Sequence, residues 1–425
     1  MEFLAPRMNK MALLALENSS GTMETIRGII LLCHWPVPTG SMYKDMTHML
    51  SGTALHLAMQ IGLHVVGTGQ DFARTILSSD ADHSSRASRA QLWIKCLITY
   101  HTTSLRQGIL PLVLIDSPQT KAFEKEIYSK SSDDLVSHLR MHNILMTATS
   151  SLVRLIPIVG SNFPSELHPF ISFYDAQLQE IVADAMSTLN TIYLYCYRIH
   201  LLAYHFLDWP NPDHAGLIKL YTISCKLIES LTSEDESTGF SRACPGFVYK
   251  TLLLAAISIL KIQKSELVRH VNSASGEKAY FSAIYLCQRM SLQSNDLGAR
   301  GVIILGQMWT SKNMYRQPDG RVNSLSTRIR SRLSMSVVFD SFWWWRVEFN
   351  GQTSPYPEQN RIAPAIAQLD AMIGADTSQV SEQSTAAQAA AFPTGLISGN
   401  MDIMPVDEPF PDYDWAVNFD FLDQI

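Results

Sequence analysis

The chain has 425 residues, of which 46% are hydrophobic and 17% charged, so it is long and apolar enough to bury a sizeable core. With 21 glycines and 19 prolines it has too few turn residues for a sandwich or barrel of many short strands, and it reaches no run of about 18 apolar residues that could cross a membrane. The formal net charge is −6, and every charged residue after Arg361 is acidic.

Helical periodicity begins at residues 22–35 and resumes at residues 44–63. In the second segment, apolar residues recur at steps of three and four, which places them on one helix face: Met46, Leu50, Ala54, Leu57 and Ile61. Pro36 and Pro38 lie between the two segments, and proline does not fit a helix interior. The sequence Trp-Pro-Val-Pro therefore predicts a connection between two helices that pack against each other.

The same periodicity predicts further helices down to residue 316. We expect them at residues 86–105, 134–156, 175–207, 215–231, 247–270, 277–292 and 300–316. Residues 209–212 and 232–239 have the composition of solvated loops. Three successive tryptophans in residues 341–350 form the last strongly apolar element, which we expect to close the core, with a partner-binding surface as the alternative.

The first three predicted helices carry a family resemblance. The first ends in Leu-Leu-Cys-His-Trp-Pro-Val-Pro, the second in Ala-x-x-x-Gly-Leu-His, and the third begins with arginines before a tryptophan and ends near a glycine. This series resembles the fungal-specific transcription factor domain, or middle homology domain, of zinc-cluster transcription factors. The positions that carry the resemblance as structural motif residues are Trp35, Pro36, Gly52, Gly62, Leu63, His64, Arg89, Trp93 and Gly108.

The resemblance covers roughly residues 20–115 and is closest to the group containing the leucine-pathway regulator and the activator of secreted proteases. It departs from the family at Tyr43, where a tryptophan is usual, and at the turn Arg106-Gln-Gly-Ile-Leu-Pro, where a Gly-Arg-Pro-like turn is usual. It implies an all-α fold of packed antiparallel helices, a regulatory domain over residues 1–350, and a nuclear role in transcription by RNA polymerase II. The implied targets are genes of a metabolic or secondary-metabolite pathway.

The family binds DNA through an N-terminal cluster of six cysteines that holds two zinc ions. The six cysteines here lie singly, the closest two 19 positions apart, which excludes such a cluster and is typical of reduced core cysteines. We therefore expect no metal or cofactor in this chain, and DNA contact only through a missing domain or a partner. We therefore expect the chain to be either a fragment or truncated gene model, or a relative that lost its DNA-binding half.

The end of the chain has a composition of its own. Residues 351–400 are rich in Gln, Ser, Thr, Pro and Ala, which predicts a disordered linker, and residues 401–425 alternate acidic with aromatic residues. Such alternation is typical of a disordered activation domain that folds against a coactivator or mediator subunit. Its expected anchors are Phe410, Tyr413, Trp415, Phe419, Phe421 and Leu422.

No catalytic constellation is evident. Ser258 and Lys261 match a Ser-x-x-Lys pattern, but the serine lies within an apolar helix. His138 and His142 form an i, i+4 pair without a third ligand, which favours a surface or capping role. The same interpretation applies to the pair His200 and His205, and to the cluster His205, Asp208, Asp213 and His214.

We thus expect a fungal transcription regulator that is not an enzyme, with regulatory and activation parts. It would pair with itself or related factors and respond to a small metabolite. Two alternatives stay open: a truncated partner that inhibits or tethers full-length factors without touching DNA, and a helical biosynthetic enzyme.

Overall fold

The computed structural model confirms the expected all-α fold. In the part of the chain that it describes, every regular element is a helix, apart from one isolated bridge between Arg316 and Val322. The described residues are 7–8, 10–12, 14, 22–40, 42–67, 69–72, 83–112, 117–128, 133–155, 167–181, 186–207, 212–294, 296–317 and 320–349. They belong to one unit, residues 1–350, while the second unit, residues 351–425, lies outside them.

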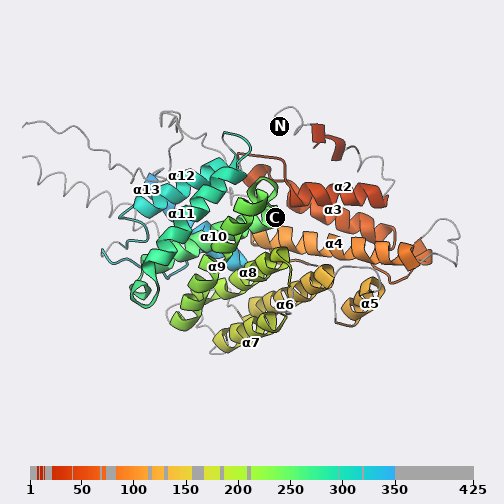
Figure 1. Ribbon diagram of the computed structural model, residues 1–425, viewed down its shortest axis with the longest axis horizontal. Helices are drawn as coiled ribbons and strands as arrows, with labels where there is room; N and C mark the ends of the chain where they lie inside the picture. The colour runs from red at the N-terminus through yellow and green to blue at the C-terminus, as the bar shows by residue number, and fades with distance from the viewer. Residues whose placement is uncertain are drawn as a thin grey trace, which may run out of the picture. The chain divides into compact units, whose positions relative to one another are not determined.

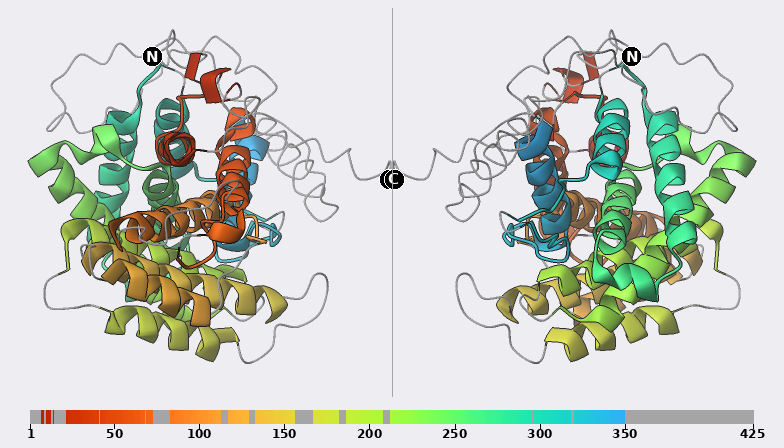
Figure 2. Two further views of the ribbon diagram at one scale, coloured as in Figure 1. Left: turned by 90° about the vertical axis from the view of Figure 1, so that its right-hand side faces the viewer. Right: turned by 90° about the vertical axis from the view of Figure 1, so that its left-hand side faces the viewer.

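The described part of the chain is built from helices in sequence order. Their bounds are α2 Met23–His34, α3 Thr47–Gln60, α4 His83–Gln107, α5 Ser117–Tyr128, α6 Asp133–Leu155, α7 Leu167–Glu180, α8 Thr188–Leu202, α9 His214–Thr238, α10 Gly246–Gln263, α11 Ser273–Met290, α12 Leu297–Thr310 and α13 Ser336–Phe349. Short 3-10 turns include η2 Gln70–Phe72, η3 Ala203–Leu207, η4 Phe240–Ala243, η5 Glu266–His270 and η6 Leu333–Met335. α6 and α7 lie on one side of the body and α11 and α12 on the other (Figures 1 and 2).

The sequence placed most helices correctly and three features wrongly. The expected segment 175–207 is two helices, α7 and α8, and α5 was not expected. The acidic stretch 232–239, expected as a loop, forms the last two turns of α9, because Asp235 is buried and pairs with Arg289. The helix ends instead at Gly239, whose φ of 70° is the left-handed conformation that glycine adopts easily.

The cysteines and the tryptophan run behave as expected. All six cysteines are free, and Cys33, Cys96, Cys196 and Cys287 are buried. Trp343, Trp344 and Trp345 are all buried on α13, so they close the core.

Helix α10 lies at the centre of the body (Figure 1). It packs against α8, α9, α11 and α13, and 16 of its 18 residues are buried. Among the described helices it is the one whose length and apolar composition would also suit a membrane span, but 89% of it is buried inside the fold, which is how a core helix behaves. Two lysines, Lys250 and Lys261, lie on this buried helix.

Lys261 is stabilised by a buried carboxylate. Its Nζ lies 3.3 Å from Oδ2 of Asp340 on α13, both side chains are inaccessible to solvent, and the Nζ also donates to the Ser326 carbonyl at 3.1 Å. The second oxygen of Asp340 accepts the backbone N–H of Arg328 at 2.9 Å. This pair therefore joins α10, α13 and the irregular segment before η6, and it excludes a role for Lys261 as a base for Ser258, which instead bonds the Leu254 carbonyl.

Breaking this pair on one side should destabilise the fold strongly. An Asp340→Leu change leaves the Lys261 ammonium buried without a counter-charge, and we expect a loss of about 3–5 kcal/mol in the free energy of unfolding. The double variant K261M/D340L removes both charges and should recover most of that loss. Urea denaturation followed by circular dichroism measures both, and equal losses in the two variants would contradict the ion-pair explanation.

The motif glycines end two helices in the same way. At the end of α3 the N–H of Leu63 bonds the Ala58 carbonyl at 2.9 Å, and that of Gly62 bonds the Met59 carbonyl at 3.0 Å, with Gly62 at a φ of 71°. These two bonds define a Schellman end. Arg89 Nη2 donates to the carbonyls of Ile61 and Gly62, both at 3.1 Å, so α4 holds the end of α3.

The end of α4 repeats this arrangement at Gly108. The N–H of Ile109 bonds the Ser104 carbonyl and that of Gly108 bonds the Leu105 carbonyl, both at 2.9 Å, and Gly108 has a φ of 68°. A Cβ at position 108 would clash with the carbonyl of Arg332. Both motif positions are therefore glycine because a left-handed helix end coincides with a close neighbour, which is the Phe72 side chain at Gly62 and the Arg332 backbone at Gly108.

Gly108→Ala should consequently cost about 1–3 kcal/mol of stability, since a left-handed residue and a backbone clash both add strain. Gly28→Ala is the matched control: Gly28 is exposed in α2 with no atom near an added Cβ, so alanine should be neutral or stabilise by about 0.5–1 kcal/mol. Thermal unfolding compares the two, and equal melting temperatures would refute the assignment.

Candidate functional site

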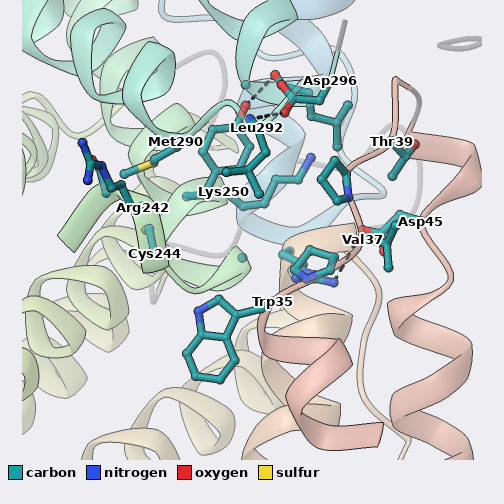
Figure 3. A pocket seen from close by; sticks show the side chains of 18 residues that line it. Trp35, Val37, Thr39, Asp45, Arg242, Cys244, Lys250, Met290, Leu292 and Asp296 are labelled. Atoms are coloured by element: carbon teal, nitrogen blue, oxygen red, sulfur yellow. Dashed lines mark hydrogen bonds and ion pairs between the residues drawn. The ribbon is translucent and has the colours of Figure 1, made fainter. Parts of the chain in front are cut away.

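A pocket lies where four helix ends meet. It is bounded by the connection after α2, the C-terminal end of α4, the N-terminal end of α10 and the loop between α11 and α12 (Figure 3). The residues that line it are Trp35, Pro36, Val37, Pro38, Thr39, Asp45, Arg106, Ser241, Arg242, Cys244, Gly246, Tyr249, Lys250, Met290, Leu292, Asp296, Leu297 and Gly298. Its volume is about 130 Å³.

Hydrogen bonds between these helix ends fix the walls. Trp35 Nε1 donates to the Ala243 carbonyl at 2.8 Å, which attaches the α2 connection to η4. The N–H of Leu297 donates to the Thr39 carbonyl at 3.1 Å, and the Tyr249 hydroxyl donates to the Leu297 carbonyl at 2.7 Å. The connection after α2 is thus held against η4 and α12, and α10 is in turn joined to the start of α12.

Arg106, near the end of α4, supplies one buried charge. It is 2% exposed, and its Nη2 lies 3.5 Å from Oδ2 of Asp45 and donates to the Thr47 hydroxyl. Its Nε has no hydrogen-bond partner among the described residues. Burial opposes ionisation of Asp45, but Arg106 and the hydrogen bonds from Thr47 outweigh it and lower the pKa of the carboxyl.

Lys250, in the first turns of α10, supplies the second buried positive charge of the pocket. It is 4% exposed, and within the described part of the chain its Nζ makes no hydrogen bond or ion pair. Burial lowers the pKa of the ammonium to about 8, with Asp45 acting against the shift and Arg106 adding to it. Lys250 is therefore charged at neutral pH and would gain from a further negative partner.

The start of α10 adds a third positive element. Its N-cap is Pro245, which offers no side-chain acceptor to the first N–H groups. Gly246 lacks a side chain, and a Cβ there would clash with the guanidinium of Arg106. The N-terminus of an 18-residue helix, with its partial positive charge, therefore lies beside Arg106.

The second carboxylate of the pocket is already satisfied. Asp296 caps α12 by accepting from Ala299 at 3.0 Å, and it also accepts the N–H groups of Leu292 at 2.6 Å and Gln293 at 3.0 Å. Among the described residues that line the pocket, the buried polar groups that still lack a hydrogen-bond partner are Lys250, the Nε of Arg106 and the N-terminus of α10, and all of them are positive. The pocket therefore suits a small anion. A cavity of 130 Å³ has room for on the order of ten water-sized atoms. A small di- or tricarboxylate is of that size.

The structure places the motif residues in two groups. Trp35 and Pro36 line the pocket, although Trp35 is 46% exposed. Gly62, Leu63, His64, Arg89 and Trp93 instead form the packed end of α3 against α4, and Gly108 ends α4. Gly52 lies in α3 with open space where a Cβ would be. The tail anchors Phe410 to Leu422 lie outside the described residues, so their roles stay predictions.

Sequence reasoning missed Lys250 and Asp45 as pocket residues. Lys250 lies in a strongly apolar stretch, and a single lysine within an otherwise buried helix was a signal that could have identified it. Asp45 gave no such signal. Its role depends on Arg106, 61 residues away in the sequence.

The paired histidines also differ from expectation. His142 is buried, with its Nε2 2.7 Å from Nδ1 of His101, and His138 Nε2 lies 2.6 Å from the Tyr197 hydroxyl. The expected surface or capping role is therefore wrong for His142, while His138 is half-buried and bonded to Tyr197. Burial lowers the pKa of His138 to about 3, so it is neutral at physiological pH.

Comparison with known proteins places the chain near fungal regulators. It is 22% identical to the regulatory protein LEU3 of Saccharomyces cerevisiae over 76% of this chain and 41% of that protein. It is 22% identical to the putative transcription factor SEF1 of Eremothecium gossypii, over 74% of this chain and 30% of that protein. The chain is 21% identical to the transcriptional regulatory protein SEF1 of Candida albicans, over 75% of this chain and 36% of that protein.

No family model matches the chain, and no solved structure matches it. The matched relatives are regulators by name and support a fungal transcription regulator. The chain spans between 30% and 41% of their length.

A small anion should stabilise the protein through the pocket. Succinate or malate should raise the melting temperature at pH 7 beyond sodium chloride of equal ionic strength, because Lys250 and Arg106 gain a counter-charge. The gain should shrink as the pH rises through about 8, where Lys250 loses its proton. Differential scanning fluorimetry of the whole chain measures it.

Two variants test the assignment. Lys250→Met removes one buried charge from the pocket and should abolish most of the anion effect. Lys226→Met, at an exposed position on α9, should leave it unchanged. An anion response that is the same in both variants would show that the anion binds elsewhere.

Proposed function

We propose that this chain is the regulatory and activating part of a fungal transcription regulator whose helical body binds a small anionic metabolite. The observation that carries the proposal is the positive pocket at the start of α10, with buried Lys250 and Arg106, in a chain similar to fungal regulators. The protein would act in the nucleus on genes of a metabolic or secondary-metabolite pathway. It would reach DNA through a zinc-cluster module or a related partner factor.

Ligand binding would act on the relative positions of helices. The pocket contains residues from the ends of α2, α4, α10 and α12, and an anion bound to Lys250 and Arg106 would contact α10 and α4 directly. A ligand shifts a conformational equilibrium by its difference in affinity for the two states. The bound state would expose the acidic tail, residues 401–425, and the free state would mask it.

The tail would be the output. By charge repulsion its acidic residues would keep the aromatic side chains apart, and Trp415, Phe419 and Leu422 occupy positions i, i+4 and i+7, which would form one face if the segment folds as a helix. Such a face fits an apolar groove on a coactivator. Affinity would be modest because ordering the segment costs about 2–5 kcal/mol.

A reporter assay tests the tail. Fused to a foreign DNA-binding domain, the chain should activate transcription, and deletion of residues 401–425 should reduce activity to background. The triple variant W415A/F419A/L422A should do the same with all acidic residues kept, while N418A/Q424A should not. Undiminished activation after the deletion would refute the tail's role.

The same reporter assay tests whether the pocket regulates activation by the tail. Lys250→Met should change reporter activity in the full chain but not in a fusion of residues 401–425 alone. A Lys250→Met chain that activates like the unaltered chain, in cells grown with and without abundant organic acids, would leave the tail as an activator and refute regulation through the pocket.

A further inference from the structure

Two histidines and an aspartate from three different elements converge on one point. Nδ1 of His168, in the first turn of α7, lies 3.3 Å from Nδ1 of His205 in η3. Oδ2 of Asp213, which precedes α9, lies 3.4 Å from Nδ1 of His205 and 3.8 Å from Nδ1 of His168. The sequence had grouped His205 with Asp213, and the fold adds His168 as a third member.

From these distances we propose that His168, His205 and Asp213 bind a divalent transition-metal ion, with zinc as the best fit. A tetrahedral zinc ion with metal-to-ligand distances of about 2.0–2.1 Å places any two of its ligand atoms about 3.3–3.4 Å apart. Two of the three distances have this value, and the third exceeds it by about 0.4 Å, which a small side-chain rotation removes. Two imidazoles with one carboxylate are a common ligand set for zinc.

The fold holds these ligands in place. Oδ1 of Asp213 accepts the N–H of Ala215 at 3.0 Å as the N-cap of α9, which directs Oδ2 toward the histidines. His205 is 1% exposed, and its ring lies against Gly216, where a Cβ would clash with it. His168 and Asp213 keep 29% and 24% of their side-chain surface exposed, so an ion could enter from solvent.

The charges around the point also suit a cation. A neutral imidazole carries its proton on one nitrogen only, so with both protons on Nε2 the two Nδ1 lone pairs and the Asp213 carboxylate would all be available as ligands for a cation. The nearby ions Asp175, Arg198 and Lys219 form a cluster of their own, with Arg198 Nε 2.7 Å from Asp175.

A bound ion would join α7 to the start of α9 across η3. This site contains no cysteine, so it is distinct from the cysteine cluster that the family resemblance implies, and it does not depend on the proposed anion pocket. The three ligands leave a fourth tetrahedral position for water or another group. Whether this site holds an ion would then determine how α7 is held against the rest of the body.

Metal titration of the whole purified chain tests the site. After treatment with EDTA and buffer exchange, one zinc ion per chain should bind and raise the melting temperature. Cobalt(II) should give visible absorption bands of a tetrahedral site without the near-ultraviolet charge-transfer band of a thiolate ligand. No stoichiometric binding, or a cobalt thiolate band, would overturn the proposal.

The ligand variants are chosen to preserve folding. His168→Gln changes a partly exposed residue, and Asp213→Asn keeps an N-cap side chain of similar strength while losing the charge. Each should weaken zinc binding at least about tenfold, while His214→Gln, an exposed neighbouring histidine, should not. Isothermal titration measures the affinities, with circular dichroism as the folding control, and wild-type affinity in either ligand variant would disprove the assignment.

Discussion

Burial of α10 on almost every side is the constraint on which the rest of the body depends. A helix enclosed by α8, α9, α11 and α13 cannot direct a lysine into bulk water, so each lysine on it needs a partner inside the protein. Lys261 has Asp340, and this pair fixes the irregular segment before α13. Lys250 faces a cavity, and the cavity is positive because Asp45 and Asp296 are already engaged.

Helix ends, rather than helix faces, build both candidate sites. The pocket is assembled from the ends of α2, α4, α10 and α12, and the histidine cluster from the beginnings of α7 and α9 with η3. Helix ends leave backbone groups without intrahelical partners, and they can move without opening the packed faces. A ligand bound at either proposed site would therefore contact several helix ends while the packed core stays intact, as the proposed regulation requires.

The residues that carry the family resemblance in the sequence have a structural explanation of the same kind. Gly62 and Gly108 end α3 and α4 in the left-handed conformation, and Arg89 joins the end of α3 to α4. The end of α4 at Gly108 brings Arg106 against Gly246 at the start of α10. A motif that looks like a packing signature in sequence thus also positions one charged wall of the pocket.

The sequence by itself determined the all-helical class, the position of most helices, the apolar core and the resemblance to fungal regulators, because periodicity and helix-ending glycines are local signals. The sequence could not show whether the polar residues 232–239 end a helix or form a loop, because exposed helix ends and loops have similar amino-acid compositions. Only the tertiary structure decided that Lys250 and Arg106 line one pocket and that His168 lies beside His205 and Asp213. These partners are brought together by packing of helices distant in the chain, and no local spacing encodes such a contact.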